Sequence, residues 1–474
     1  MEISEVIRVG FSLLLRALPV VLCGAVCFVG AYQLIYKKLL NGTGKINTIA
    51  IVLISVMIIY LFVVLEVTVL LRAGFEGNGR VEPLLSVYKD AWHTWSGRAW
   101  RNIVLNVLMF VPLGILLPLV GKVFRKFWVT YLCGAALSAM IEGLQLALNR
   151  GLCSLDDLIN NASGAMIGYG LYSAVAYLID RKNNRAKALR RNAVLSQIPL
   201  VFAVFVALGI LASYNAKELG NTQYRLVNND ETSVLGIRKN YEFAGDARTL
   251  PIYKTESVSV KNARRQCFEL LKGFKEDTEK VKFTNHDGSI WAVTDNGSVI
   301  IIYNTIGKTW LYTNYRTSRK ANSGELSMYS NASEDDVLLR LQACGVQIPS
   351  GYTFKEAFEG VYQFSWNKVL NGDVLTDGTV TVKICGNGKI YSVRNEARIG
   401  SFYKDIEVIS ERDSLEMIRK GQFYNHIEPN SYIELYSCEI TYQLDSKGYN
   451  QPFYSYGAKI NSKSVTLLIP AIKE

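Results

Sequence analysis

Three hydrophobic stretches of this 474-residue chain carry polar residues whose spacing would place them on helix faces. The stretches are residues 102–120, 127–148 and 157–179, and each is long enough for a membrane helix. Residues four, seven or eleven positions apart share one face of a helix. The polar residues and glycines at such spacings are Asn102 and Asn106, then Ser138, Glu142 and Gln145, then Asp157, Asn161, Gly164 and Gly168. Unpaired polar groups in hydrocarbon cost several kcal/mol, so we expect the three stripes to pack together or around a wet cavity.

Several of these residues are candidates for binding a polar ligand. Glu142 is ionisable and lies within a membrane stretch, where such residues are functional by default. Arg101 and Arg150 are candidates for binding an anionic group such as a lipid phosphate, with nearby carboxylates as hydrogen-bond or proton partners. The alternative is a mutually satisfied polar cluster, including an Arg150–Asp157 ion pair, that only fixes helix packing. For Gly164 and Gly168 we favour close helix packing over ligand contact.

The same residues form three ordered motifs that resemble those of the VanZ-like family of bacterial membrane proteins. The motifs cover about residues 100–172 and read N-x3-F-x-P-x-G from Asn106, E-x2-Q-x4-R from Glu142 and D-x3-N-x2-G-x3-G from Asp157. Cys153 departs from the polar or acidic residue expected after Arg150. The resemblance implies a link to reduced susceptibility to lipid-bearing glycopeptide antibiotics such as teicoplanin. The ligand-binding candidates are Arg101, Asn102, Asn106, Glu142, Gln145, Arg150, Asp157 and Asn161, and the structural candidates are Pro112, Gly114, Ser138, Gly164 and Gly168.

The hydropathy of the first 215 residues predicts a multi-pass protein of the cell membrane. We expect about six spans, of which the other three are residues 10–36, 47–71 and 194–214. Glu66, near one end of the second span, is expected to reach the interface. Cations concentrate in the loops between spans one and two, three and four, and five and six, which predicts that those loops are cytoplasmic. With six spans, the N-terminus, the polar residues after span four and the C-terminal half lie outside the cell. An odd number of spans would place the C-terminal half inside.

The loop before residue 102 carries Trp92, Trp95 and Trp100. Tryptophans of this kind form a belt at the level of the lipid head groups. An aromatic lid over a site made by the polar stripes is the alternative, and the sequence does not separate the two.

Residues 216–474 read as a soluble α+β domain with antiparallel sheets, so the predicted fold class is an α-helical polytopic membrane bundle followed by this domain. Short alternating runs such as SIWAVTD and TVTVKIC predict strands, and turns such as DNG and CGNGK separate them. The order suggests two helix-plus-sheet repeats, at about 216–330 and 331–474. The pattern weakly resembles PepSY-like or cystatin-like modules. It contains no catalytic motif, which favours a binding or regulatory module.

Composition limits the remaining function classes. The formal net charge is +11, which fits cationic flanks of membrane spans and attraction to anionic lipid. The chain has only three histidines and no C-x2-C pair, so we expect no metal site. It carries no Gly-rich phosphate loop and no nucleic-acid signature, so we expect no cofactor and no nucleic-acid partner. Cys267, Cys344, Cys385 and Cys438 could form one or two disulfides if the C-terminal half is outside, or remain separate thiols.

Three functions are consistent with these features. The first is a cell-envelope membrane protein that binds a lipid-linked wall precursor or a lipoglycopeptide, with membrane lipids around it. The second is a membrane enzyme that modifies a lipid head group, with Glu142 or Asp157 as general base. The third is an envelope sensor or scaffold that uses the soluble half. We favour the first because it follows from the VanZ-like motifs.

Overall fold

A computed structural model describes residues 48–70, 81–148, 153–180, 186–222, 227–228, 234–239, 248–286, 288–295, 297–423, 425, 427, 431–461 and 463–473. The chain divides into two compact units, the first ending at Lys217 and the second beginning at Glu218. The expected span at residues 10–36 and the candidate Arg150 lie outside the described residues.

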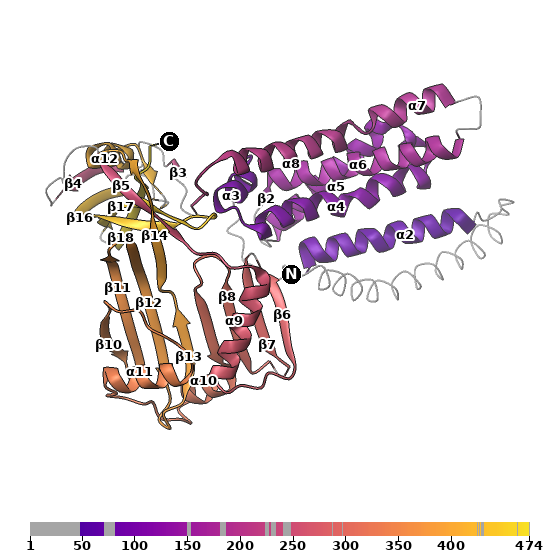
Figure 1. Ribbon diagram of the computed structural model, residues 1–474. Coiled ribbons are helices and arrows are strands. Elements are labelled where there is room, and N and C mark those ends of the chain that lie inside the picture. Colours follow the sequence, from indigo (N-terminus) through magenta and orange to yellow (C-terminus); the bar gives the residue numbers. More distant parts are fainter. Residues whose placement is uncertain are drawn as a thin grey trace. The chain divides into compact units, whose positions relative to one another are not determined.

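The first unit is built from helices (Figure 1). They are α2 (Thr48–Leu65), which continues as the π-helix η2 (Glu66–Leu70), α3 (Ser86–Thr94), α4 (Gly97–Val120), the 3-10 helix η3 (Lys122–Arg125), α5 (Phe127–Ala147), α6 (Leu155–Asp180), α7 (Ala186–Leu195) and α8 (Ile198–Ala216). Two short strands, β1 (Val81–Glu82) and β2 (Cys153–Ser154), pair in parallel. Five of the helical segments are long and apolar enough to cross a membrane: Ile49–Val69, Gly97–Val120, Phe127–Ala147, Leu155–Asp180 and Arg190–Ala216. They confirm the helical membrane bundle and coincide with five of the six expected spans.

The helices α4 and α6 pack through glycines. A β-carbon at Gly164 would lie 2.0 Å from the carbonyl oxygen of Val107, and one at Gly168 would lie 2.1 Å from that of Val111. From the other side, a β-carbon at Gly114 would lie 2.1 Å from the carbonyl oxygen of Ala165. No side chain fits at these three positions, so the two backbones are in direct contact. The small residues therefore set how closely the polar residues earlier in the two helices approach each other.

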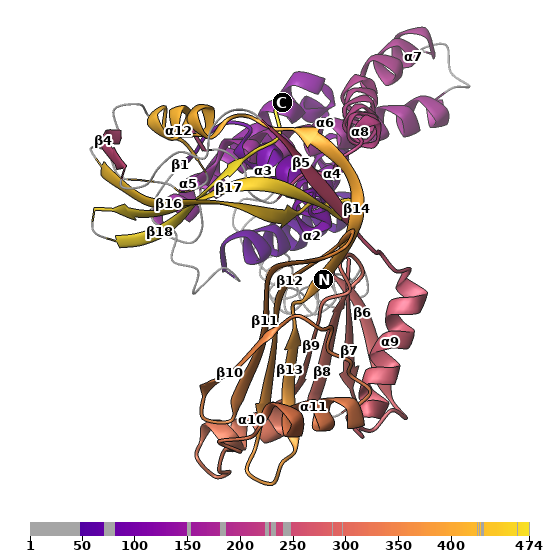
Figure 2. The same ribbon diagram turned by 60° about the vertical axis from the view of Figure 1, so that its left-hand side comes forward.

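The second unit is a large, mainly antiparallel sheet with short helices, as the predicted fold class requires. Its strands are β3 (Val227–Asn228), β4 (Val234–Lys239), β5 (Thr249–Thr255), β6 (Val281–His286), β7 (Ser289–Thr294), β8 (Val299–Asn304), β9 (Trp310–Asn314), β10 (Thr353–Phe358), β11 (Val361–Asn371), β12 (Val374–Ile384), β13 (Ile390–Asn395), β14 (Arg398–Glu407), β15 (Gln422–Phe423), β16 (Ser431–Leu444), β17 (Tyr449–Ile460) and β18 (Lys463–Pro470). Its helices are α9 (Val260–Gly273), α10 (Tyr315–Asn322), α11 (Glu334–Ala343) and α12 (Glu411–Arg419). The main sheet runs β4-β16-β17-β5-β14-β12-β13-β9-β8-β7-β6 (Figure 2).

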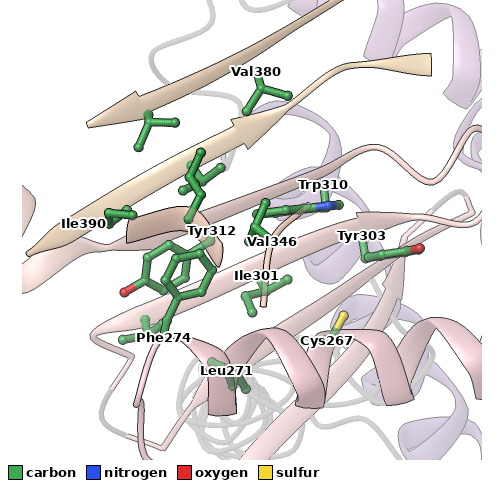
Figure 3. Packing of buried hydrophobic residues seen from close by; sticks show 14 of the residues in the cluster. Cys267, Leu271, Phe274, Ile301, Tyr303, Trp310, Tyr312, Val346, Val380 and Ile390 are labelled. Atoms are coloured by element: carbon green, nitrogen blue, oxygen red, sulfur yellow. The ribbon is translucent and has the colours of Figure 1, made fainter. Parts of the chain in front are cut away.

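Two large hydrophobic cores support this sheet, and Tyr253, Leu375 and Tyr442 form a third, smaller cluster among the described residues. In the first, Leu271 of α9 and Leu341 of α11 pack with buried residues of β7–β13, so one core includes residues on both sides of position 330. Figure 3 shows Phe274 lying against Tyr312 in this core, where the two rings stack with centroids 3.8 Å apart. The second core joins α12 to β16, β17 and β18. The four cysteines of this unit are free thiols, so the disulfide alternative is not realised.

Candidate functional site

A polar cluster lies where α5 ends and α6 begins. The backbone amide of Ser154, the residue before α6, donates to Glu142 Oε2 at 2.8 Å. The hydroxyl oxygen of Ser154 accepts from the amide of Asp157 at 3.4 Å, as a serine before a helix commonly does. Glu142 is only 5% exposed, so its carboxylate is directed into the protein and not toward lipid.

The three predicted stripes meet through side-chain hydrogen bonds. Asn106 of α4 donates to the Asp157 carboxylate of α6 at 2.6 Å. One turn further along α6, Asn161 donates to the hydroxyl of Ser138 on α5 at 3.0 Å. The structure thus brings together four of the predicted residues from three helices.

Gln145 makes its contact with a fourth helical segment. Its side-chain amide donates at 2.8 Å to the backbone carbonyl of Thr68, within the π-helix η2. Glu66 begins this π-helix and is 7% exposed. The expectation that Glu66 reaches the interface is therefore wrong, because α2 and η2 pack on α4 and α5 and turn this end of the helix inward.

One predicted stripe residue, Asn102, and one predicted structural residue, Pro112, lie elsewhere. Asn102 is exposed on the surface of α4, although Asn106, one turn later, is inside the cluster. Pro112 is also exposed, while Gly114 lies at the helix crossing. The close backbone contacts of α4 with α6 lie further along the helix, at Val107 and Val111, so helical spacing alone did not predict the exposure of Asn102.

Asp156 anchors the site, although helical periodicity in the sequence did not single it out. It is fully buried and accepts hydrogen bonds from the backbone amides of Leu85 at 2.7 Å and Val87 at 2.9 Å. Tyr88 of α3 also donates to the side-chain oxygen of Asn160. The only signal in the sequence was the pair of acids in the first turn of a helix, where carboxylates are favoured. These contacts hold α3 over the beginning of α6.

The cluster is acidic. Glu82 pairs with Ser154 across β1 and β2, which places its carboxyl group near Asp156 and Asp157. Burial raises the pKa of Glu82, the hydrogen bond from Ser86 opposes this, and Asp90, Asp157 and Asp156 add to the rise. Burial followed by the charge of Glu142 also raises the pKa of Cys153. The described cations on the neighbouring helices are Lys89 of α3 and Arg98 and Arg101 at the start of α4.

Buried polar atoms of the cluster retain unused hydrogen-bonding capacity. Asn161 Oδ1, Gln145 Oε1 and Asn160 Nδ2 have no hydrogen-bond partner among the described residues, and each residue is 2% exposed. Buried polar atoms in folded proteins are nearly always paired, and exceptions need an explanation such as a bound water or ligand. Asn161 Oδ1 and Gln145 Oε1 can accept hydrogen bonds, and Asn160 Nδ2 can donate one.

An aromatic cluster lies at the same end of the bundle. Trp95 stacks on Tyr214 of α8 with ring centroids 3.5 Å apart, and Trp92 and Trp100 each meet Trp95 edge-on. The ammonium of Lys217 lies 5.1 Å from the ring centre of Trp92. The three predicted tryptophans thus gather around the end of α8, where the chain leaves the first unit.

The chemistry available to this site is hydrogen bonding by carboxylates and amides, and proton exchange by the carboxylates. Among the residues that the structure describes, no group of three or more His, Cys, Asp or Glu side chains is arranged to hold a metal ion. The hydrogen-bonding groups of the cluster lie together at one end of the helix bundle.

Comparison with known proteins agrees with the motifs in the first unit. Residues 48–177 match the family model described as VanZ/LLP1. No similar sequence was found among curated proteins.

Two solved structures are similar to part of the chain. One is an uncharacterized protein from Eubacterium rectale ATCC 33656, at 10% identity and a TM-score of 0.24, covering 53% of this chain and 92% of that chain. The other is the Bacillus megaterium YpeB C-terminal domain, at 10% identity and a TM-score of 0.20, covering 46% of this chain and 95% of that chain. These values are too low to carry a functional argument, and the PepSY-like or cystatin-like resemblance stays a prediction.

Proposed function

Starting from the VanZ-like membrane domain at residues 48–177, we propose that this membrane protein binds a lipid-linked or lipidated ligand of the cell envelope at the outer leaflet. The observation that carries the proposal is the convergence of polar side chains from α4, α5 and α6 on a cluster with unpaired buried atoms. Polar groups are expensive inside a membrane, and they persist where they contact each other, water or a ligand.

The ligand class follows from the site and the family. A lipid-linked wall precursor and a lipoglycopeptide such as teicoplanin both combine an acyl or isoprenoid chain with a polar head group. The head group would reach the carboxylates and amides of Glu142, Asp157 and Asn161, while the chain would lie along the apolar surfaces of the helices. Arg101, with Arg150, would neutralise an anionic group on the ligand.

Charge distribution supports an outward-facing site. Lys122, Arg125 and Lys126 lie between α4 and α5, at the end of the bundle opposite the polar cluster. Arg190 and Arg191 of α7, the helix that follows α6, lie at that same end. Short basic loops remain in the cytoplasm, so the polar cluster and the end of α8 would face outward, and the second unit would be extracytoplasmic.

The test is antibiotic susceptibility in a null strain. The strain would carry the wild type, Glu142→Gln, Arg150→Ala, or a truncation after residue 216, with membrane levels measured for each. Asn106→Ala and Asn102→Ala give a matched pair, because Asn106 bonds Asp157 whereas Asn102 is exposed. We expect Glu142→Gln, Arg150→Ala and Asn106→Ala to lose protection against teicoplanin, and Asn102→Ala to keep it.

The outcomes separate the functions. Protection that survives all three site variants at normal membrane levels would overturn the site. Protection that depends only on the second unit would favour a binding module with a membrane anchor. Protease added to intact spheroplasts should degrade the second unit, whereas its protection until the membrane is permeabilised would contradict the orientation.

A further inference from the structure

The second unit contains a basic pocket that the membrane site does not use. It has a volume of about 540 Å³, within the range of small-molecule sites, and opens to solvent beside α10. Its charged lining consists of Arg316, Arg319 and Lys320 of α10, with Glu325 as the single carboxylate. The cations exceed the acid by two, so the pocket is suited to an anion.

Within the described residues, the three cations have no structural partner. None of them forms an ion pair or a side-chain hydrogen bond with another residue in the described part of the chain. Arg316 and Lys320 are four residues apart, and Arg319 is three residues from Arg316, so they occupy neighbouring positions on the helix surface. Like charges at such spacings repel, which makes the arrangement unfavourable unless an anion lies between them.

The opposing carboxylate is already engaged. Ser323 donates its hydroxyl proton to Glu325 at 3.0 Å. The remaining lining residues are Gly297, Ser298 and Tyr315, which are neutral and add polar groups to one wall. The cations of α10 are therefore the main source of charge in the pocket.

The helix that carries them is firmly anchored. Asn314 precedes α10, accepts a hydrogen bond from the amide of Thr317 at 3.0 Å and donates to Glu276 at 3.0 Å. Tyr312 of β9 also donates to Glu276, at 2.7 Å, and stacks on Phe274 in the first core (Figure 3). The helix start is thus tied to the core through Glu276, which fixes the backbone from which the cations project.

We propose that this pocket binds phosphate groups, either as a free phosphate or as the diesters of an anionic envelope polymer. Guanidinium groups bind phosphate oxygens through paired N–H donors, and lysine adds a point charge. The two arginines would contact phosphate oxygens directly, and Lys320 would neutralise a second anionic group along a polymer. This binding is independent of the VanZ-like site in the first unit.

The experiment uses the full-length protein in a neutral maltoside detergent. Binding of inorganic phosphate and of a soluble glycerol phosphate oligomer would be titrated, with an uncharged glycerol oligomer as the negative probe. The pocket variant is the double substitution Arg316→Gln with Lys320→Gln. The matched control is Lys261→Gln with Arg265→Gln, which removes two exposed cations four residues apart on α9, outside the pocket. Thermal unfolding would establish that both variants remain folded.

The results distinguish binding in the pocket from nonspecific attraction of anions to the basic protein surface. We expect the pocket variant to weaken binding at least tenfold, the α9 control to change it less than twofold, and 0.5 M salt to weaken wild-type binding. Binding of the oligomer alone would identify the anionic polymer as the ligand. Binding of both probes would show that the pocket recognises the phosphate group itself. Equal losses in the two variants, or no binding by the wild type, would overturn the proposal.

Discussion

The side-chain amide of Asn106 lies 2.6 Å from the carboxylate of Asp157, and this hydrogen bond joins α4 to α6 just before their glycine contacts begin. Beyond it, Gly164 and Gly168 bring the two backbones together. The polar cluster is therefore closed on one side by direct backbone packing. This arrangement makes the following outcomes testable.

Replacing Gly164 with alanine should destabilise the bundle. The new methyl group would meet the carbonyl oxygen of Val107 at 2.0 Å, and overpacking of this kind costs about 1–3 kcal/mol or more. We expect a lower unfolding temperature in detergent and less protein in the membrane. Gly143→Ala is the control, because a β-carbon there has no heavy atom within 4 Å. Equal stability of the two variants would contradict the close crossing.

Removing the carboxylate of Asp156 should release α3 from α6. Asp156→Ala leaves the amides of Leu85 and Val87 without their acceptor, at a cost of about 1–3 kcal/mol for each amide that stays buried. Limited proteolysis should then cut residues 81–96 faster than in the wild type. Asp180→Ala, at the exposed end of the same helix, should leave the cleavage rate unchanged. If both variants are cut equally fast, Asp156 is not the anchor.

Stability should depend on the ionisation of Glu82. Its pKa is raised, chiefly by burial, so the folded protein binds this proton more tightly than the unfolded chain does. The contribution of Glu82 to stability is therefore present at low pH and is lost as pH rises from the ordinary glutamate pKa through the raised value. As the pH rises from about 4 through the raised pKa, Glu82→Gln should lose less stability than the wild type. Thermal unfolding of both proteins across this range is the measurement, and parallel curves would refute the assignment.

Asp445 should hold the beginning of the second unit in place. Its buried carboxylate accepts from the backbone amides of Gly220, Lys447 and Tyr449 and from the side chain of Gln451, at 2.6–2.8 Å. Asp445→Ala should free residues 218–222, so that trypsin cleaves after Lys217 several times faster. Asp405→Ala removes an exposed carboxylate of β14 and serves as the control. An unchanged cleavage rate in Asp445→Ala would show that other contacts hold this segment.

The membrane bundle could be predicted from the sequence, because a long apolar run in lipid satisfies its backbone hydrogen bonds by forming a helix. The same periodicity placed Asn106, Ser138 and Asn161 on faces that meet in the structure. It failed for Asn102, because a helix face is defined by spacing but its burial depends on where the neighbouring helix begins. The alternating runs likewise predicted strands in the second unit, since the side chains of a strand alternate between faces.

The sequence by itself determined the long membrane helices, the strand-rich second unit, and that Gly164 and Gly168 permit close packing. It did not identify α3, which lies in a stretch that was expected from the sequence to be a loop. Only the tertiary structure decided which of these residues contact one another. Asp156 became the anchor of α3 because residues 85 and 87 lie beside it although they are far away in the chain. Glu66 is buried because α2 packs against α4 and α5. The three cations of α10 line one pocket together with Gly297 and Ser298, which precede the helix in the chain. Hydrogen bonds and burial depend on distances in space between residues far apart in sequence, and these distances are fixed only when the elements pack.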